Sequence, residues 1–384
     1  MRFEFSTVSR IIFGEGVFHE SAELARQMGQ RILIVSGIRG EFVDSLVKNL
    51  EKLGCESSIF EVNTEPSVNS LMLGLDTAKK NACDVVLSLG GGSAIDTGKV
   101  ISIMATNPGE ILDYLEVIGK GKEIQVPGIP LIAIPTTAGT GAEVTRNAVI
   151  GSPEQGVKVS LRSSFMLPRV AINDPELTYS LPPDVTAFTG MDALTQLIEP
   201  FVSLNANPMT DSLCKDGIVK VAQSLKKVYL DGQDQAARRD MGLASLFGGL
   251  ALANAKLGAV HGFAGPIGGM FSIPHGTVCA RLLGVVMDVN IRALKERQPT
   301  NPASQRYQEI ARILTGSEKA DVIDGVKWID DLCVSLHIPS LAEQGLSRES
   351  IPELVEMAAK SSSMRGNPIQ LTQDELGEIL ERVL

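Results

Sequence analysis

The sequence predicts an α/β domain followed by an all-helical domain. In the first half, short β-branched runs alternate with amphipathic stretches, a pattern typical of a largely parallel sheet covered by helices. Beyond the turn and N-cap signal at Leu181–Asp184, strand-like alternation is rare. The chain has 384 residues, enough for two or three domains that each bury a core. We therefore expect domains over residues 1–180 and 181–384.

The elements of the first half are expected to form a doubly wound α/β domain. The chain begins with a strand or hairpin over Phe3–Phe13. Buried apolar runs then predict strands at Arg31–Ser36, Ser57–Val62, Asp84–Leu89 and Pro130–Ile134. Amphipathic stretches between them predict helices at Glu41–Leu53, Val68–Lys80 and Ser93–Thr106. Further strands over Ile150–Ile172 are expected at the sheet edge.

The second half is expected to be helical. Small and apolar residues over Met241–Leu257 predict a closely packed core helix, and Leu371–Leu384 predicts a last helix. The glycine- and proline-rich stretch Gly258–Gly276 is expected to interrupt the helical pattern.

Composition excludes several classes of function. Lysine and arginine number 35 against 45 acidic residues, so the net charge of −10 repels phosphate backbones and argues against a nucleic-acid partner. The five cysteines are scattered and show no CxxC pair, so we expect neither disulfides nor a thiolate zinc site, and a reducing cytoplasm fits best. We expect no export signal and no membrane span, and we expect a homo-oligomer, a dimer or higher.

Two polar loops follow predicted strands and are candidate nucleotide contacts. Gly90, Gly91, Gly92 and Ser93 follow one strand and open a helix, where bare N–H groups could hold a diphosphate. Pro135–Gly141 follows another strand, at the sheet edge where ligands bind in open α/β folds. A plain tight turn remains the alternative for each loop.

A second candidate site combines carboxylate, amide and imidazole groups. Asp192 and Gln196 are four residues apart on a predicted helix, so both project from one face. His261 and His275 flank the glycine- and proline-rich stretch. One aspartate with two imidazoles suits Zn²⁺ or Fe²⁺ and leaves positions open for water and a substrate oxygen. The alternative is that these histidines are hydrogen-bonded core groups.

Several motifs occur together in the order and spacing of one known family. They are Gly90–Ser93 with Asp96 and Lys99, Pro135–Thr145, Asn173–Pro175 running on to Asp192–Leu194 with Glu199, Val260–Gly262 and Ile273–Gly276. With these motifs the chain resembles the iron-containing (group III) alcohol dehydrogenases over nearly its whole length.

The resemblance implies a Rossmann-like dinucleotide-binding domain over 1–180, a helical metal and substrate domain over 181–384, and an active-site cleft between them. Dehydroquinate synthase shares this general architecture. A nicotinamide cofactor, NAD(P)H, would lie along the Gly90 loop with Asp96, and Lys158 would reach it near its nicotinamide end. Thr136, Thr137 and Thr140 would surround its adenine and ribose side.

The metal in typical members is held by an aspartate and three histidines, and Asp192, His261 and His275 match three of these positions. Gln196 stands at the fourth, where an amide oxygen is a weaker ligand than imidazole. Gly265 stands where many members carry a histidine near the nicotinamide. Proton transfer would then run through water or a cofactor hydroxyl, or would not occur.

Gly37 stands where NAD-preferring relatives carry an aspartate, which would bind the ribose 2′-hydroxyl and repel a 2′-phosphate. Its absence leaves room for NADP, and Arg39 is either a contact to that phosphate or a solvated surface arginine. We expect NADPH to be the better donor. The remaining histidines, His19 and His337, are assigned to structure or surface, as are Trp328 and the cysteines.

The resulting hypothesis is an alcohol dehydrogenase or aldehyde reductase in which a divalent metal, Fe²⁺ or Zn²⁺, acts as Lewis acid and nicotinamide carries hydride. Asp192, His261, His275 and Lys158 are its expected catalytic residues. The alternatives are a metal-independent reductase like maleylacetate reductase, a lyase like dehydroquinate synthase, and a non-catalytic nucleotide-binding protein.

Overall fold

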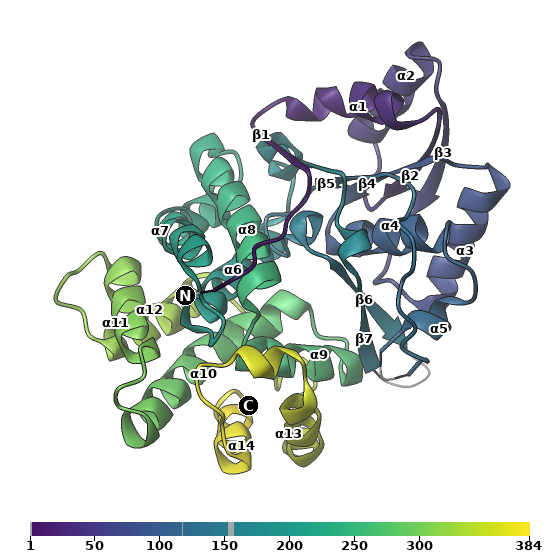
Figure 1. Ribbon diagram of the computed structural model, residues 1–384. Helices are drawn as coiled ribbons and strands as arrows, with labels where there is room; N and C mark the ends of the chain where they lie inside the picture. The colour runs from purple at the N-terminus through teal and green to yellow at the C-terminus, as the bar shows by residue number, and fades with distance from the viewer. Residues whose placement is uncertain (1, 117, 153–156) are drawn as a thin grey trace. The chain divides into compact units, whose positions relative to one another are not determined.

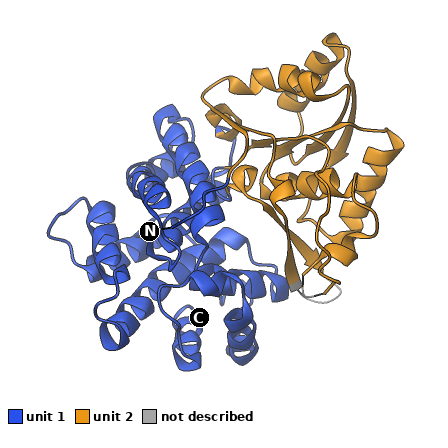
Figure 2. Cartoon of the chain, viewed as in Figure 1, with its two compact units in different colours: residues 1–6, 138–140, 179–384 blue, residues 7–137, 141–178 orange. Residues whose placement is uncertain are grey.

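The computed structural model describes residues 2–116, 118–152 and 157–384. The chain divides into two compact units, shown in Figure 2. One unit comprises residues 7–137 and 141–178, and we call it the α/β unit. The other comprises residues 1–6, 138–140 and 179–384, and we call it the helical unit.

The α/β unit is built on a six-stranded parallel sheet in the order β1-β8-β5-β4-β2-β3 (Figure 1). Its strands are β1 (Arg10–Phe13), β2 (Arg31–Ser36), β3 (Glu56–Glu61), β4 (Val85–Gly90), β5 (Leu131–Pro135) and β8 (Val170–Asn173). Its helices are α1 (Ser21–Met28), α2 (Glu41–Lys52), α3 (Val68–Lys80), α4 (Gly92–Met104) and α5 (Ile111–Tyr114). The predicted α/β architecture is confirmed.

Both faces of this sheet are covered by helices, which explains the continuous apolar runs of its strands. In β2, Ile32 and Ile34 pack with α1 and α2 on one face. Leu33 and Val35 pack with Ala78 of α3 and with α4 on the other. Figure 1 shows α1 and α2 on one side of the sheet and α3 and α4 on the opposite side.

Two predictions about strands are wrong. Only Arg10–Phe13 of the expected hairpin is a strand, because Ser6 is held instead by Asn254, whose amide accepts from the Ser6 N–H at 2.6 Å and donates to its carbonyl at 3.0 Å. The strands expected at the sheet edge also lie elsewhere. β6 (Asn147–Ser152) and β7 (Val157–Arg162) form a separate antiparallel pair, while β8 lies inside the sheet between β1 and β5.

The helical unit is packed around α6 (Pro183–Val202), whose residues from Gly190 onward are buried. The helices around it are α7 (Pro208–Leu230), α8 (Gln235–Ala255), α9 (Ala259–Met270) and α10 (His275–Arg297). The others are α11 (Ala303–Thr315), α12 (Val322–Ser335), α13 (Ile351–Lys360) and α14 (Gln373–Arg382). The predicted helical C-terminal half is therefore confirmed.

The interruption expected over Gly258–Gly276 is only partly present, because α9 runs through Pro266 and the helical pattern breaks before it, at residues 256–258, and after it, at residues 271–274. Val260, Phe263, Ala264 and Ile267 are buried in α9 at helical spacing, and this apolar stripe supports the helix despite its glycines.

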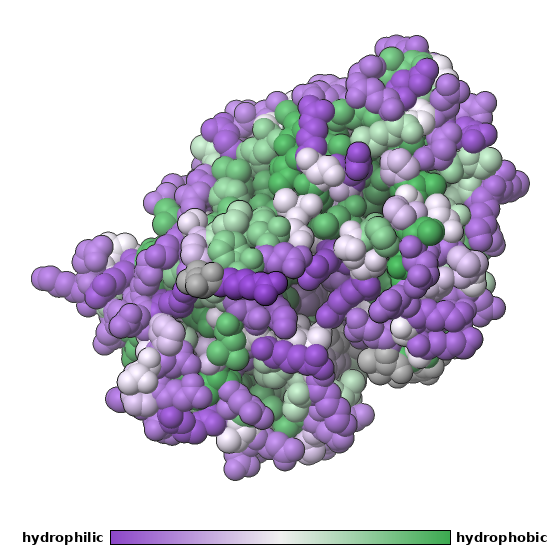
Figure 3. All heavy atoms as spheres, viewed as in Figure 1, coloured by the Kyte–Doolittle hydropathy of each residue, from purple (hydrophilic) through white to green (hydrophobic). Residues whose placement is uncertain are grey.

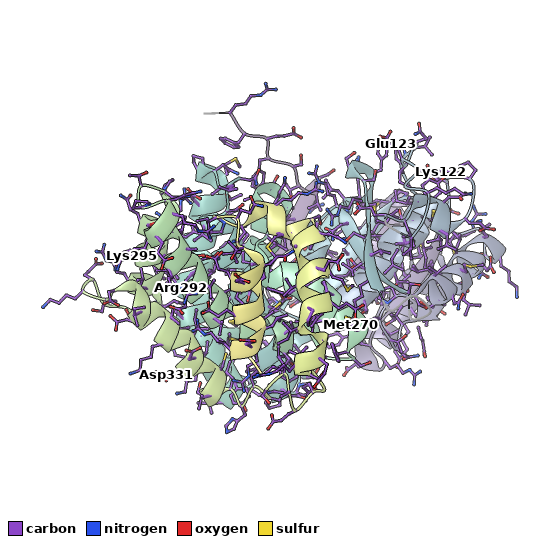
Figure 4. All side chains as sticks on the ribbon, turned by 90° about the horizontal axis from the view of Figure 1, so that it is seen from below. Lys122, Glu123, Met270, Arg292, Lys295 and Asp331 are labelled. Atoms are coloured by element: carbon purple, nitrogen blue, oxygen red, sulfur yellow. The ribbon has the colours of Figure 1, made fainter. Side chains whose placement is uncertain are left out.

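Helices α13 and α14 lie side by side in Figure 4, near Arg292 of α10. Arg292 pairs with Glu378 of α14 at 2.5 Å. Figure 3 shows mainly hydrophilic residues on the visible face, with apolar residues between them. Among the described residues no single helix is long and apolar enough to cross a membrane. Helices α8 and α9 reach that length and hydropathy only when taken together, and the pair is bent by 101°.

Candidate metal centre and cofactor loop

Four side chains from three helices of the helical unit bring their donor atoms together. They are Asp192 of α6, His261 of α9, and His275 and Cys279 of α10. One donor atom from each lies within 4.8 Å of all the others. The sequence prediction that Asp192, His261 and His275 could share a ligand thus corresponds to a real cluster, which we call the Asp192 cluster.

The two carboxylate oxygens of Asp192 contact different groups. Oδ1 lies 3.4 Å from Nε2 of His261 and 3.6 Å from Nε2 of His275. This oxygen is buried and accepts no hydrogen bond from any described residue. Oδ2 accepts a hydrogen bond of 2.9 Å from Nε2 of Gln196, one helical turn away on α6. A buried anionic oxygen without a donor is costly unless a cation compensates it.

Glu199, one turn beyond Gln196 on α6, fixes the ring of His261. His261 Nδ1 lies 2.6 Å from Oε2 of Glu199, and the Val260 N–H donates to Oε1 at 2.7 Å. With Nδ1 donating to this carboxylate, Nε2 is left to face Asp192 as a potential ligand. The sequence analysis included Glu199 only as part of a motif and gave it no role.

His275 and Cys279 are four residues apart on α10, so they project from one face of that helix. The side chain of His275 is 40% exposed, whereas Asp192, His261 and Cys279 are buried. The cluster is thus accessible from the His275 side. Every cysteine was expected to be structural or on the surface because the sequence contains no paired cysteines, whereas Cys279 lies one helical turn from a histidine.

The charges of the cluster are coupled. Burial works to raise the pKa of Asp192, but His275 and His261 outweigh it and hold that pKa below its ordinary value. Burial works to lower the pKa of His261, but Cys279, Glu199 and Asp192 hold it well above its ordinary value. The cluster is therefore a buried anionic site that favours positive charge. A divalent cation fits this donor set, because imidazole and carboxylate are ligands of Fe²⁺ and Zn²⁺.

The glycine loop forms the start of α4 in the α/β unit. β4 ends at Gly90, Gly91 is the N-cap of α4, and no side chain caps this helix end. A Cβ at Gly90 would lie 2.7 Å from the Ala94 Cβ and 2.9 Å from the Gly37 nitrogen, so only glycine fits. The loop therefore presents bare N–H groups at the positive end of a helix, as diphosphate binding requires.

The second polar loop starts beside the first. The Thr136 N–H donates to the Gly90 carbonyl at 3.0 Å, and a Cβ at Gly91 would contact Thr137 at 3.5 Å. Gly37, at the end of β2, joins the same edge because its N–H donates to the Leu89 carbonyl at 2.9 Å. Thr140 lies in the short segment 138–140 that belongs to the helical unit.

Asp96 and Lys99 of α4 lie in the interior of the α/β unit. Oδ2 of Asp96 accepts from the Val149 N–H at 2.9 Å, and Oδ1 lies 3.5 Å from Nζ of Lys99. Lys99 donates to Oγ1 of Thr145 and to the Asn147 carbonyl, both at 2.8 Å. These contacts attach α4 to β6 and to Thr145, which precedes it.

Two other residues expected at the cofactor have partners in the α/β unit. Lys158 of β7 pairs with Glu65 at 2.6 Å. The guanidinium of Arg39 pairs with the carboxylate of Glu61, and both side chains are largely exposed. Gly265 lies within α9, and a Cβ there would meet no described atom within 4 Å.

Family models match both halves of the chain. The model "Iron-containing alcohol dehydrogenase" matches residues 8–175, and the model "Fe-containing alcohol dehydrogenase family, C-terminal" matches residues 186–384. Together they cover the strands and helices that form both candidate sites.

Individual proteins match over nearly the full chain. "Alcohol dehydrogenase 4" of Saccharomyces cerevisiae is 36% identical over 376 residues, covering 96% of this chain and 95% of that protein. The structure of a 1,3-propanediol oxidoreductase has a TM-score of 0.92 at 32% identity, with 100% of both chains covered. Sulfoacetaldehyde reductase from Bifidobacterium kashiwanohense, solved with NAD⁺, has a TM-score of 0.86 at 32% identity, covering 100% of this chain and 99% of that one. This chain therefore belongs to the iron-containing alcohol dehydrogenase family and is an alcohol oxidoreductase.

Proposed function

We propose that this chain interconverts a small primary or secondary alcohol and its aldehyde or ketone, with NAD(P)H as hydride carrier and a divalent cation, Fe²⁺ or Zn²⁺, at the Asp192 cluster. The observation that carries the proposal is Oδ1 of Asp192, which is buried without a hydrogen-bond donor among the described residues and lies between two imidazole nitrogens. A metal-independent reductase would have to balance this oxygen with protonated imidazoles alone.

The two halves of the chain would divide the work. In residues 1–180, the N–H groups of Gly91, Gly92 and Ser93 would hold the cofactor diphosphate. Thr136 and Thr137 start beside that loop and would contact the adenine and ribose side, with Thr140. Lys158 would serve the nicotinamide end after releasing Glu65.

In residues 181–384, Asp192, His261 and His275 would hold the cation, and Glu199 would keep Nε2 of His261 directed at it. When bound, the cation polarises the carbonyl oxygen and the nicotinamide donates or accepts the hydride. The half-exposed ring of His275 leaves this group open to a small substrate.

Three finer properties belong to the same proposal. We infer NADPH as the preferred donor, because Gly37 carries no carboxylate to repel a 2′-phosphate and Arg39 follows it closely. The free cysteines support a cytoplasmic location, where thiols stay reduced. We also expect a homo-oligomer, a dimer or higher, which light scattering after size exclusion would measure.

The test is a screen of short aldehydes, diols and 2-hydroxy acids with the protein reconstituted with Fe²⁺ or Zn²⁺, using NADH and NADPH in parallel. We expect turnover that depends on the added metal and falls by orders of magnitude in His275→Ala, because Lewis-acid polarisation supplies several kcal/mol. Wild-type turnover in that variant, or full activity after chelation, would refute the metal role. Cofactor binding without any turnover would indicate a non-catalytic protein.

A further inference from the structure

Cys279 is the one member of the Asp192 cluster that neither the family resemblance nor the proposed function assigns a role. Its Sγ lies 3.6 Å from Nε2 of His275 and 3.9 Å from Nε2 of His261, and its side chain is fully buried. A thiol can donate its one hydrogen to one nitrogen and accept weakly from an N–H on the other, so both contacts are within reach of sulfur hydrogen bonds. A shared cation accounts for them together with the approach of Asp192 Oδ1 to the same two nitrogens.

Four of the six separations between donor atoms match a tetrahedral cation site, and the other two are within 4.8 Å. Bonds of about 2.0–2.1 Å to nitrogen or oxygen and about 2.3 Å to sulfur place tetrahedral nitrogen and oxygen ligands about 3.4 Å apart, and nitrogen and sulfur about 3.6 Å apart. The nitrogen to oxygen distances from His261 and His275 to Asp192 are 3.4 and 3.6 Å. The sulfur to nitrogen distances from Cys279 are 3.6 and 3.9 Å.

Gln196 contacts Asp192 but is not one of the four residues whose donor atoms cluster together. Its Nε2 donates to Oδ2 of Asp192, the oxygen that does not face the imidazoles. Its other amide atom, Oε1, is buried without a hydrogen-bond partner among the described residues and lies beside α8, where a Cβ at Gly248 would be 3.7 Å away. In this arrangement Gln196 holds the carboxylate so that Oδ1 faces His261 and His275. That is the position of a residue that orients a ligand rather than of a ligand itself.

We infer that Cys279 is the fourth protein ligand of the cation, completing a set with Asp192, His261 and His275, and that Gln196 is a positioning residue for Asp192. This inference rests on the proposed metal-assisted function. A thiolate with two imidazoles selects a borderline cation such as Zn²⁺ or Fe²⁺ and disfavours Mg²⁺ and Ca²⁺, which prefer oxygen ligands.

The first test uses the wild-type protein and needs no variant. After reconstitution with one equivalent of Zn²⁺, X-ray absorption at the zinc edge is expected to show one sulfur scatterer at about 2.3 Å beside lighter atoms at about 2.0–2.1 Å. After reconstitution with Co²⁺, a thiolate-to-cobalt charge-transfer band is expected in the near-ultraviolet spectrum. Bound metal with only nitrogen and oxygen neighbours would overturn the inference and leave metal assistance intact.

The second test compares variants by metal affinity and by the cobalt spectrum, with folding of each metal-free variant checked by circular dichroism. Cys279→Ser is expected to lose the charge-transfer band and to bind the metal more than about 100-fold more weakly. That loss exceeds the roughly 10–100-fold typical when a residue that only orients a ligand is removed. Gln196→Ala is expected to keep the band and lose about 10–100-fold. Cys214→Ala is the matched control, because Cys214 is also fully buried in the helical unit but lies outside the cluster.

The outcomes separate the inference from the function on which it rests. Unchanged metal affinity in Cys279→Ser, or a larger loss of affinity in Gln196→Ala than in Cys279→Ser, would refute the inference alone. A wild-type protein that retains no Zn²⁺, Fe²⁺ or Co²⁺ after reconstitution would refute the metal-assisted function and the inference together.

Discussion

Nδ1 of His261 lies 2.6 Å from Oε2 of Glu199, and this contact decides which nitrogen of the ring faces Asp192. Both residues are buried, and Glu199 is held in turn by the Val260 N–H at 2.7 Å. A carboxylate behind a ligating histidine fixes its tautomer and raises its basicity.

Glu199→Gln is therefore expected to lower metal affinity about 10–100-fold while the metal-free protein stays folded. The amide keeps a hydrogen-bond acceptor for His261 but lacks the negative charge. Titration of the variant with Zn²⁺ against a competing chelator measures the change. Affinity equal to that of the wild type would show that the contact serves only packing.

Gly276 sets the distance between the first turn of α10 and α6. A Cβ at this position would lie 2.1 Å from the carbonyl oxygen of Phe188 and 2.5 Å from its carbonyl carbon. Because these are backbone atoms, Gly276→Ala must displace α10 and with it the neighbouring His275. We expect a loss of about 1–3 kcal/mol in the free energy of unfolding, together with weaker metal binding.

Gly377 provides the matched control, because it also lies within a helix, α14, but a Cβ there would meet no described atom within 4 Å. Gly377→Ala is expected to raise the free energy of unfolding by about 0.5–1 kcal/mol and to leave metal affinity unchanged. Denaturant unfolding of both variants gives the comparison. Equal effects of the two substitutions would contradict the steric argument.

Glu143 makes the stability of the α/β unit depend on pH. Burial raises the pKa of this carboxyl from its ordinary 4.5 to about 7, against the opposing effects of Lys99 and of Asn173, whose amide donates to Oε1 at 2.8 Å. Its other oxygen, Oε2, is buried without a hydrogen-bond partner in the described part of the chain. The folded protein therefore favours the protonated carboxyl.

A raised folded-state pKa means that the protonated form contributes stability below pH 4.5, and that this contribution is lost as the pH rises to about 7. Relative to Glu143→Gln, the wild type is expected to lose up to about 3 kcal/mol across that window and nothing further above it. Unfolding of both proteins at several pH values measures this difference, in which groups common to both cancel. Parallel stability curves would show that the pKa of Glu143 is the same in the folded and unfolded protein.

In the α/β unit, local sequence patterns were sufficient to predict those helices and strands whose own residues carry a clear helix or strand pattern. The helix Val68–Lys80 was predicted to the residue, and Ser67 caps it through Oγ. The placement of β8 was not predictable, because the four residues Val170–Asn173 do not encode which strands flank them. In α9, glycines and Pro266 obscured an apolar stripe that tertiary packing uses.

The metal cluster was only partly visible in the sequence. Asp192 and His261 are far apart along the chain, so the residues alone left both a metal site and hydrogen-bonded core histidines open, and the resemblance to a family favoured the metal site. Cys279 was missed although its offset of four residues from His275 places both on one helical face. That offset predicts a shared face only once a helix is known to run through both residues, and α10 begins at His275, directly after the break at residues 271–274.

The guanidinium of Arg39 pairs with the carboxylate of Glu61, and under the proposed preference for NADPH this carboxylate would compete with the cofactor 2′-phosphate for Arg39. Arg39 lies two residues beyond Gly37, which borders the glycine loop, while the Glu61 carboxylate neutralises its guanidinium. Glu61→Gln removes that competing charge. The expected result is a lower KM for NADPH, by up to about fivefold, with a smaller change for NADH, since the pair is exposed and screened.

The double variant distinguishes contact from simple charge removal. If Arg39 binds the phosphate, Arg39→Ala raises the KM for NADPH, and adding Glu61→Gln to it brings little further change, because the residue that Glu61 neutralised is gone. If Glu61 only repels the phosphate through its own charge, Glu61→Gln improves NADPH by the same factor with or without Arg39. Steady-state kinetics with both cofactors on all four proteins measures the coupling, and a coupling of zero would reduce Arg39 to a surface residue.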